Sequence, residues 1–578
     1  MFRVMRVDLA ERACEVLERP ELREEWLGGS GAAISLLLEE CPQGVDPFSP
    51  ENPLVLAVGP LNGLFPCASK TVAAFKSPVT NNLGETHAGG RLGLALRMAG
   101  LDAIVIKGFS ERPCALSIVN DRAHFIDASP LVGATALEAE RYLRSMGVPG
   151  LQSTLTIGPA GERMVSYANV CVDRYNYFGR LGMGAVMGAK NLKAVSVAGT
   201  GEVKVPNADL YKRLYERVYD EVVNTEKMSK YHYVGTPVNV LALNAIKALP
   251  SKNFRDATYE RAEEISGELI AEKYLEFKLS CAGCPLGCLH VAKLRDPFRP
   301  GYEYAPIDVY YNYESIYALG SNLCIGDAAS VLRLIRRANE LGMDTMLLGT
   351  ALAWATEAYE RGLISPSETI VEPKWGDLEA YLRMVDFIVS PPNDFYAALS
   401  QGPERASEAY GGGEFCLTIG GNGMPGYHTG YANILGMLVG ARHSHNSNAG
   451  YSIDQRALKE PMGLEEAVRR LAREDDWRYV LTSLVICMFS REVYTEGVVV
   501  ECLRAVGLER TVDELLSMGR RIYLRAQEFK SREGFSLRSV KVPERLFETP
   551  TPHGRLDRGV LERMLELYIQ LKWGGQGA

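Results

Sequence analysis

The chain has 578 residues and a formal net charge of −8, with 47% hydrophobic and 23% charged residues. These ordinary globular values exclude a disordered or collagen-like chain. The acidic balance argues against a general nucleic-acid-binding protein, which needs a basic face. No run approaches the ~20 apolar residues of a transmembrane helix, and the first nine residues lack the features of a secretory signal. We therefore expect a cytoplasmic protein of about three domains.

The first 203 residues predict a β-rich domain of short strands broken by glycine. The first nine residues alternate in polarity like a strand, and further strands are expected at residues 54–58, 103–106, 115–119, 123–126 and 193–197. The Val205-Pro206 dipeptide then interrupts the pattern. We place the end of the first domain at this interruption.

Helical periodicity dominates from residue 204 onward. Asp209 is expected to cap a helix whose apolar residues run from Leu210 to Val222. Further helices are expected at residues 328–341, 346–361, 378–389, 464–473 and 561–572. Glycine-rich sequence between residues 411 and 426 indicates a boundary near residue 415. The predicted fold is α+β, with a β-rich domain (1–203) followed by two mainly α-helical domains (204–414 and 415–578).

The sharpest local motif is Cys281-Ala-Gly-Cys284-Pro-Leu-Gly-Cys288. Three thiolates within eight residues can wrap one corner of an iron–sulfur cubane and leave backbone amides free to bond its sulfurs. A zinc site that adds His290 is the alternative, because the motif alone specifies only soft-metal binding. A cubane needs a fourth ligand from elsewhere in the chain, and the candidates are Cys324, Cys416, Cys487 and Cys502.

The remaining cysteines carry no motif. A cytoplasmic chain with twelve cysteines predicts metal ligands and buried thiols in place of disulfides. Seven cysteines stand alone in the sequence and are interpreted as structural: Cys14, Cys41, Cys67, Cys114, Cys171, Cys416 and Cys502.

Two segments of the first domain, residues 84–93 and 179–193, combine glycine with positive charge. Adjacent glycines let backbone amides approach a phosphate, although tight turn packing is the alternative for each segment. Five cations could add counter-charge: Lys70, Arg91, Arg174, Arg180 and Lys190. Beside the cysteine motif, these segments predict an organic cofactor with phosphates near an iron–sulfur cluster.

Several segments together resemble the aldehyde ferredoxin oxidoreductase family, over residues 1 to about 573. They are residues 49–52, 59–61, 157–162, 179–194, 281–288, 313–315 and 318–320. The resemblance implies a β-rich base for two pterins that chelate tungsten, covered by two helical domains. It also implies oxidation of an aldehyde to an acid, with electrons passing through a [4Fe-4S] cluster to ferredoxin or a ferredoxin-like subunit. Tungsten and molybdenum are not distinguished.

The family's downstream D-x-x-G-L-C motif falls on Thr482 to Cys487, which makes Cys487 the implied fourth cluster ligand and Ile486 its cofactor-side neighbour. The aspartate and glycine of that motif are missing here. The related D-x-x-G-L-D motif appears with asparagine in place of its first acid, and implies pterin contacts from Asn339, Gly342, Met343 and Asp344.

On the phosphate side, Lys70 stands where the family often has arginine, and His87 where an asparagine helps to hold a bridging magnesium. Gly89 and Gly90 match the family pattern. Two more cofactor contacts, Arg180 and Gly182, come from the second glycine-rich segment. An iron shared between subunits is not expected, because Arg333 replaces the glutamate that would bind it. The sequence leaves the oligomeric state open.

Three residues are expected to serve catalysis. Glu314 matches the family's acidic residue and lies in a tyrosine-rich segment that we expect to bury it partly and raise its pKa. The alternative is a solvated glutamate at a helix start. His445 is favoured over His443 as the hydrogen-bond donor to the substrate oxygen, and Tyr427 is a further pocket residue.

Competing functions remain at this point. One is a related tungsten or molybdenum oxidoreductase with a substrate other than an aldehyde. Another is an electron-transfer subunit that carries the cluster without a pterin. A zinc-stapled binding protein is the third.

Overall fold

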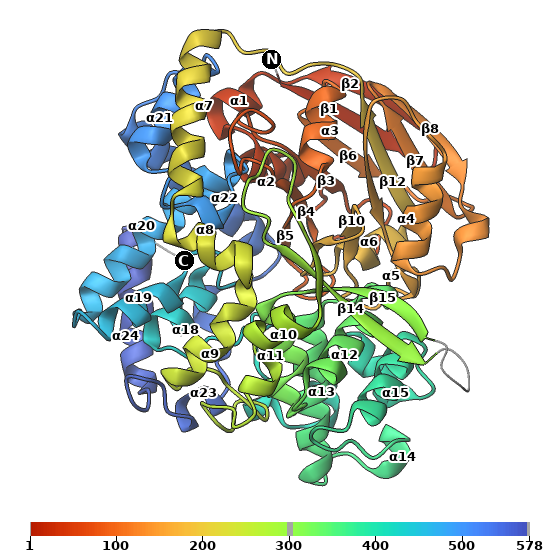
Figure 1. The fold of residues 1–578 in the computed structure, drawn as a ribbon, viewed down its shortest axis with the longest axis vertical. Helices are drawn as coiled ribbons and strands as arrows, with labels where there is room; N and C mark the ends of the chain where they lie inside the picture. Colours follow the sequence, from red (N-terminus) through yellow and green to blue (C-terminus); the bar gives the residue numbers. More distant parts are fainter. Residues whose placement is uncertain (1, 298–303, 575–578) are drawn as a thin grey trace. The chain divides into compact units, whose positions relative to one another are not determined.

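The computed structural model describes residues 2–297 and 304–574 (Figure 1). The backbone packs into two compact units. The first contains residues 1–228, 280–286 and 473–536, and the second contains residues 229–279, 287–472 and 537–578. Two helices, α8 (Glu226–Tyr233) and α20 (Leu464–Ser483), each contribute residues to both units. The three predicted domain ranges are a division by sequence and remain a prediction.

The first unit contains two six-stranded mixed sheets. In the first sheet β1 pairs with β6 in parallel, and every other neighbouring pair is antiparallel. Its spatial order is β2 (Ala13–Glu18), β1 (Arg3–Asp8), β6 (Ala103–Lys107), β3 (Leu54–Ala57), β4 (Thr71–Lys76) and β5 (Leu83–Ala88). Met1, the first residue of the predicted N-terminal strand, lies outside the described residues.

The second sheet joins β7 and β12 in parallel and is otherwise antiparallel. Its order is β11 (Asn176–Phe178), β10 (Val170–Val172), β9 (Leu151–Thr156), β12 (Leu192–Gly199), β7 (Cys114–Val119) and β8 (Arg122–Asp127). Apolar side chains of both sheets, such as Leu56, Ile104, Leu155 and Val195, belong to one buried core. The predicted β-rich N-terminal domain is confirmed.

Helices complete the first unit, and Figure 1 shows α3 and α4 lying beside its strands. They are α1 (Glu21–Trp26), α2 (Gly29–Glu40), α3 (Leu92–Met98), α4 (Ala136–Ser145), α5 (Pro159–Glu162), α6 (Met183–Ala189), α7 (Ala208–Val223), α21 (Glu496–Ala505) and α22 (Val512–Arg532). The predicted cap of α7 is wrong by two residues. Asn207, one residue before the helix, accepts the Leu210 amide at 3.0 Å, and Asp209 lies inside the first turn.

The second unit is mainly helical. Its helices are α9 (Asn239–Ala245), α10 (Gly267–Lys273), α11 (Tyr313–Leu319), α12 (Ala328–Leu341), α13 (Thr345–Glu360), α14 (Pro366–Thr369), α15 (Leu378–Val389), α16 (Asp394–Ser400), α17 (Pro403–Tyr410), α18 (Tyr431–Val439), α19 (Gly450–Ala457), α23 (Arg545–Glu548) and α24 (Arg558–Trp573). The helices predicted at 328–341 and 378–389 are confirmed residue for residue. The one predicted at 464–473 was too short, since α20 continues to Ser483.

A three-stranded antiparallel sheet in the second unit was not predicted. It runs in the order β13 (Leu275–Leu279), β14 (Leu289–Pro297) and β15 (Tyr304–Tyr311). A two-stranded ribbon of β16 (Thr418–Ile419) and β17 (Asn422–Gly423) is the other sheet of this unit in the described ranges. The cysteine motif lies in the connection between β13 and β14.

Among the described residues, no single helix is both long and apolar enough to cross a membrane. One helix pair, Tyr313–Leu323 with Ala328–Leu341, meets the length and composition criteria jointly, but it bends by 115° at the break. Most of its apolar side chains are buried within the fold.

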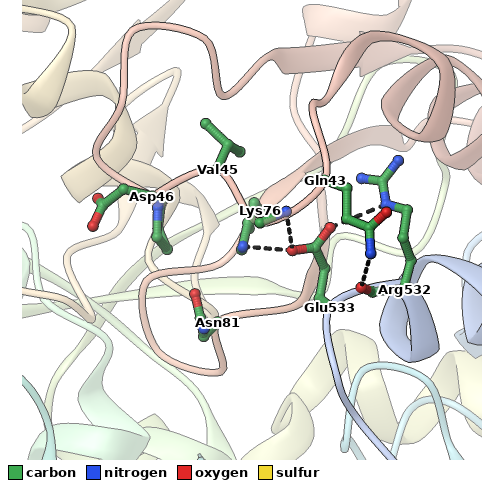
Figure 2. A pocket seen from close by; sticks show the side chains of 9 residues that line it. Gln43, Val45, Asp46, Lys76, Asn81, Arg532 and Glu533 are labelled. Atoms are coloured by element: carbon green, nitrogen blue, oxygen red, sulfur yellow. Dashed lines mark hydrogen bonds and ion pairs between the residues drawn. The ribbon is translucent and has the colours of Figure 1, made fainter.

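A polar cavity of about 390 Å³ lies in the first unit, between the loop at residues 43–47, the end of β4 and the end of α22. Figure 2 shows Lys76 and Glu533 facing each other in it, and their side chains form a 2.6 Å ion pair that is 3% and 1% exposed. Arg532 adds a 3.0 Å contact to the same carboxylate. None of the predicted cluster or catalytic residues lines this cavity.

We expect Glu533→Ala to lower the free energy of unfolding by about 3–5 kcal/mol, because it leaves the buried Lys76 ammonium without its anion. Burial raises the pKa of Glu533, but Lys76, the Gly44 amide and Arg532 together bring it below the ordinary 4.5. The ion pair's contribution to the free energy of unfolding is therefore present above pH 4.5, and it is lost as the pH falls below that value. Chemical unfolding followed by circular dichroism measures both effects.

The matched control is Glu528→Ala on α22, the helix that ends just before Glu533, because Glu528 pairs with Arg525 at 3.0 Å but is 56% exposed. It should change the unfolding free energy by less than about 1 kcal/mol. Equal losses in the two variants would contradict a stabilising role for the buried pair.

Candidate functional site

Cys281 and Cys284 lie on a short loop that packs within the first unit. The Cys284 amide donates to the Cys281 carbonyl at 3.1 Å, and the Ala282 amide donates to the Gly90 carbonyl at 3.0 Å. Gly283, between the cysteines, has φ +68°, a conformation that glycine adopts without strain. These bonds hold the cysteine loop against the first glycine-rich segment.

Gly89 lies against the same loop at a point where three side chains approach its backbone closely. A Cβ atom at residue 89 would stand 2.4 Å from the Cys281 Sγ, 2.8 Å from the Asn176 Oδ1 and 3.2 Å from the Lys70 Nζ. A thiol, an amide oxygen and a cation therefore converge on one backbone position. This cradle suits the predicted arrangement, in which a phosphate-binding segment lies beside a cluster ligand.

The loop that carries Cys487 follows the end of α20, and two glycines from the N-terminal part of the unit pack closely against that end. A Cβ at Gly29 would lie 2.4 Å from the Thr482 carbonyl oxygen, and one at Gly59 would lie 2.5 Å from the Ser483 carbonyl oxygen. The Lys70 amide donates to the Val485 carbonyl at 3.2 Å. Such close approach fixes the path of the loop where the family motif has lost its own glycine.

Cys487 is buried, and Cys281, Cys284 and Lys70 all act on it electrostatically. Burial is the largest cause that raises the pKa of the Cys487 thiol, and Lys70 opposes it. The structure thus brings together three of the four predicted cluster ligands within the first unit. Cys288, the remaining predicted ligand, belongs to the second unit, which resumes at Gly287.

A further thiol at this site was missed from the sequence. Cys67, interpreted as an isolated structural cysteine, places its Sγ 3.6 Å from the Cys284 Sγ. Its contact is the largest cause that raises the pKa of Cys284 above the ordinary value, with burial second. No local signal could have identified Cys67, because its neighbours in the sequence carry no ligand spacing.

The zinc alternative offered His290 as a possible fourth ligand beside the three cysteines of the motif. Both ring nitrogens of His290 face backbone carbonyls instead, that of Cys288 at 3.2 Å and that of His232 at 3.2 Å. Burial lowers the pKa of His290. In the ranges 2–297 and 304–574, no group of three or more His, Cys, Asp or Glu side chains surrounds a single ion position. The ligand set of Cys281, Cys284, Cys288 and Cys487 stays a prediction.

The predicted phosphate-side cations have different surroundings. Arg91 forms an ion pair with Asp173 at 3.3 Å. Lys190 is fully buried and donates to the Pro50 carbonyl at 2.8 Å, and burial lowers its pKa to about 7. Lys190 thus has a backbone partner, and its expected role as counter-charge stays a prediction. Lys70, beside Gly89, remains in a position to do so.

Gly182 precedes α6 with φ +85°, and a Cβ there would stand 2.0 Å from the Ser166 carbonyl oxygen. Close packing and a left-handed backbone thus require glycine at this position. Arg180, two residues earlier, is partly exposed. Their predicted contacts with a cofactor stay predictions, as does that of Ile486.

His87 belongs to a buried polar group that the sequence did not reveal. Its Nε2 lies 2.8 Å from the Glu85 Oε1, which also accepts the Ser30 hydroxyl at 2.6 Å. Tyr479 donates to the other oxygen of Glu85 at 3.3 Å. Glu85 is thus a carboxylate beside the predicted magnesium residue, and magnesium prefers oxygen ligands.

In the second unit the predicted pterin motif joins α12 to α13. Asn339 donates to the Tyr310 carbonyl at 3.4 Å, Gly342 ends α12 with φ +79°, and Met343 is fully buried. Asp344 caps α13 by accepting the Met346 and Leu347 amides at 2.9 and 3.2 Å. The motif has a clear local structural role, and its pterin contacts remain predictions.

Three predicted catalytic residues meet in the second unit. Glu314 stands in the first turn of α11, which Asn312 caps, and is 24% exposed. The Glu314 Oε1 lies 3.4 Å from the His445 Nε2 and accepts the Tyr427 hydroxyl at 3.5 Å. Glu314 does stand at a helix start, as the alternative of a solvated glutamate expects. That alternative does not account for its contacts with His445 and Tyr427.

The expected rise in the pKa of Glu314 is wrong. Burial does raise it, but the hydrogen bond and charge of His445, with the Tyr427 hydroxyl, bring it below the ordinary 4.5. Burial holds the pKa of Tyr427 well above its ordinary value, so the phenol stays protonated. The site therefore presents a carboxylate held by two donors.

His445 and His443 have different environments. His443 is buried, with its Nδ1 2.8 Å from the Met437 carbonyl. The His445 ring packs on Tyr427 at 5.1 Å between centroids, and its buried Nδ1 has no hydrogen-bond partner among the described residues. Tyr451, missed from the sequence, stacks on Tyr427 at 4.5 Å. An orphaned polar nitrogen beside a carboxylate is a position suited to a ligand.

Comparison with known proteins identifies the family of this chain. Residues 4–199 match the model of the aldehyde ferredoxin oxidoreductase N-terminal domain, and residues 213–577 match domains 2 and 3 of the same family. The tungsten-containing aldehyde ferredoxin oxidoreductase of Pyrococcus furiosus is 33% identical, over 100% of this chain and 96% of that protein.

Two other similarities are more distant. The WOR-like subunit of an aliphatic sulfonate oxidoreductase from Pyrococcus furiosus is 29% identical, over 70% of this chain and 66% of that protein. The fold resembles a chain of the active-site complex BamBC of benzoyl coenzyme A reductase, with a TM-score of 0.83, 22% identity and coverage of 99% of this chain and 94% of that chain. The full-length match and both family models show that this chain belongs to the aldehyde ferredoxin oxidoreductase family of tungsten-containing oxidoreductases.

Proposed function

We propose that the chain oxidises an aldehyde to a carboxylic acid with a tungsten bis-pterin cofactor, and passes the electrons through a [4Fe-4S] cluster to ferredoxin or a ferredoxin-like subunit. The observation that carries the proposal is the Glu314–His445 pair. One ring nitrogen is held by the carboxylate, and the other is buried without a hydrogen-bond partner in residues 2–297 and 304–574. Such a pair can bind an oxygen atom and move a proton. We also propose a cytoplasmic location, where thiols stay reduced.

The conversion of an aldehyde and water to an acid releases two electrons and two protons. Because the Nε2 of His445 faces the carboxylate, it carries a proton in either charge state of the ring. The Nδ1 then accepts a proton from a substrate hydroxyl when the ring is neutral, and donates to a carbonyl oxygen when the ring is charged. Glu314, ionised near neutral pH, stabilises the charged ring and accepts one of the released protons.

Tyr427 orients this pair without titrating. Its hydroxyl donates to Glu314, accepts from the Asn239 side chain at 3.4 Å, and its ring packs on His445. Tyr451 stacks on Tyr427 at 4.5 Å and contacts His445 at 6.0 Å between centroids, so the three rings form one cluster.

Cofactor binding is assigned to the remaining predicted residues. A bound tungsten bis-pterin, or its molybdenum counterpart, would supply the two-electron acceptor. Lys70, Arg180 and the amides near Gly89, Gly90 and Gly182 would hold its phosphates, and His87 would help to hold a magnesium ion. Cys281, Cys284, Cys288 and Cys487 would ligate the cluster. The cradle at Gly89 supports this assignment, since it joins Lys70 to Cys281.

A second candidate keeps the cofactors and changes the substrate. The sulfonate oxidoreductase relative and the altered pterin motifs, with Asn339 and Thr482 where the family has aspartates, favour it. An aliphatic sulfonate would then be the substrate class. An electron-transfer subunit without pterin is less well supported, because it has no use for the Glu314–His445 pair.

The test is a substrate panel with protein purified without oxygen. Short aliphatic aldehydes, aromatic aldehydes and aliphatic sulfonates are each incubated with oxidised ferredoxin. We expect an aldehyde to yield its acid and to reduce about two ferredoxins per molecule, because the reaction releases two electrons. Turnover of a sulfonate alone would favour the second candidate. Protein that carries both cofactors but oxidises no aldehyde of the panel would contradict the proposal.

A further inference from the structure

The backbone at Cys67 links the two loops that carry cluster cysteines in the first unit. The Cys67 amide donates to the Gly283 carbonyl at 3.2 Å, and its carbonyl accepts the Cys487 amide at 3.0 Å. Tyr494 also donates its hydroxyl to the carbonyl of the preceding residue, Pro66. Residue 67 is therefore held in place from both sides of the thiol group.

This position is strained for a cysteine. Cys67 has φ +63°, in the left-handed region that glycine occupies without cost and that other residues avoid. Strain of this kind persists when the surrounding structure holds it, and it gathers at functional sites. A glycine would satisfy the backbone, so the backbone alone does not account for the side chain.

The thiol itself points at a predicted cluster ligand. The Cys67 Sγ lies 3.6 Å from the Cys284 Sγ, and Cys67 is fully buried. A cysteine that binds iron does so as a thiolate, so the Cys284 sulfur would carry no proton in the loaded protein. Of the two sulfurs, only Cys67 could then donate the hydrogen bond.

We propose that Cys67 is a fifth thiol of the cluster site, which donates an S–H···S hydrogen bond to the Cys284 sulfur and raises the reduction potential of the cluster. The inference rests on the proposed [4Fe-4S] cluster. Reduction adds negative charge to the cluster and its sulfurs, and a hydrogen-bond donor stabilises that charge. Cys67 is thus a positioning residue that acts through Cys284, not a ligand.

The test compares Cys67→Ala, Cys67→Gly and Cys67→Ser in the full chain, with cluster reduction followed by electron paramagnetic resonance at controlled potential. We expect the alanine and glycine variants to keep the iron content of the wild type while their reduction potential becomes more negative. The serine hydroxyl can still donate, so Cys67→Ser should restore part of the shift. Cys67→Gly removes the left-handed strain, and thermal melting then separates loss of the donor from loss of the fold.

The control is Cys502→Ala, because Cys502 is a buried thiol of α21 that lies outside the cysteine loops. It should leave the potential unchanged. Loss of iron from Cys67→Ala and Cys67→Gly would make Cys67 a ligand and overturn the proposal, and so would an unshifted potential. Wild-type protein without iron and sulfide would overturn the proposed cluster itself, a result distinct from an unshifted potential.

Discussion

Glu314→Gln is expected to lower kcat by about 10²- to 10⁴-fold, the usual effect of removing a group that transfers a proton. The glutamine keeps the size of the side chain but cannot accept a proton or stabilise a charged His445. Tungsten and iron contents should not change. Steady-state kinetics with an aldehyde and ferredoxin measure the loss, and metal analysis shows that the cofactors remain.

Two further variants serve as comparisons for the expected loss of kcat. Tyr427→Phe removes a single 3.5 Å hydrogen bond to Glu314 and should cost only about tenfold. Glu379→Gln alters an exposed glutamate in the first turn of α15, a position like that of Glu314 but without the histidine, and should have no effect. A kcat for Glu314→Gln within about threefold of the wild type would contradict proton transfer by Glu314.

The same account predicts the acidic limb of the pH profile. The pKa of Glu314 lies below 4.5, so the carboxylate stays ionised as the pH falls from neutral toward that value. Activity limited by Glu314 protonation should therefore decline only below pH 4.5. A decline governed by Glu314 above that pH would place its pKa in the raised range that the sequence first suggested.

Cys487→Ala is expected to abolish electron transfer to ferredoxin and to reduce the iron content well below about four atoms per chain. The buried thiol lies in the electrostatic field of Cys281, Cys284 and Lys70, and alanine has no atom that can replace it. Iron analysis and visible absorption of anaerobic protein measure the loss. Circular dichroism establishes that the variant is folded.

Cys502→Ala serves again as the matched control, since it removes a buried thiol of the same unit and should keep the iron. Retention of about four irons by folded Cys487→Ala would contradict the assignment of the fourth ligand. Cys67 would then be the nearest alternative, because its sulfur already contacts Cys284.

Local sequence signals predicted much of the fold. The bounds of α12 follow from the Asp327 cap, which accepts the Ser330 amide at 2.9 Å, and from Gly342 at its end. The sheet of β13 to β15 was missed because its strands lie among helices and carry no distinctive turn sequence. At α7 two capping residues stand two positions apart, and the helix begins at the first of them.

Part of the candidate site could also be predicted from local sequence signals, and part could not. The cysteine loop and Gly89 could be identified from motifs, since close spacing and paired glycines leave a trace in the sequence. The contacts of Glu314 with His445 and Tyr427, and the stacking of Tyr451 on Tyr427, could not be identified, because tertiary packing forms them and periodicity does not encode it. The expected direction of the pKa shift of Glu314 was wrong for this reason. Burial was expected, but the hydrogen bonds that offset its effect on the pKa were not.

The most direct test of the central claim is metal and pterin analysis of the chain, purified without oxygen from its native source, together with its visible absorption. The account predicts about four irons, one tungsten or molybdenum and two pterins per chain, with broad iron–sulfur absorption. Colourless protein that contains zinc, without iron or pterin, would contradict it and favour a binding protein.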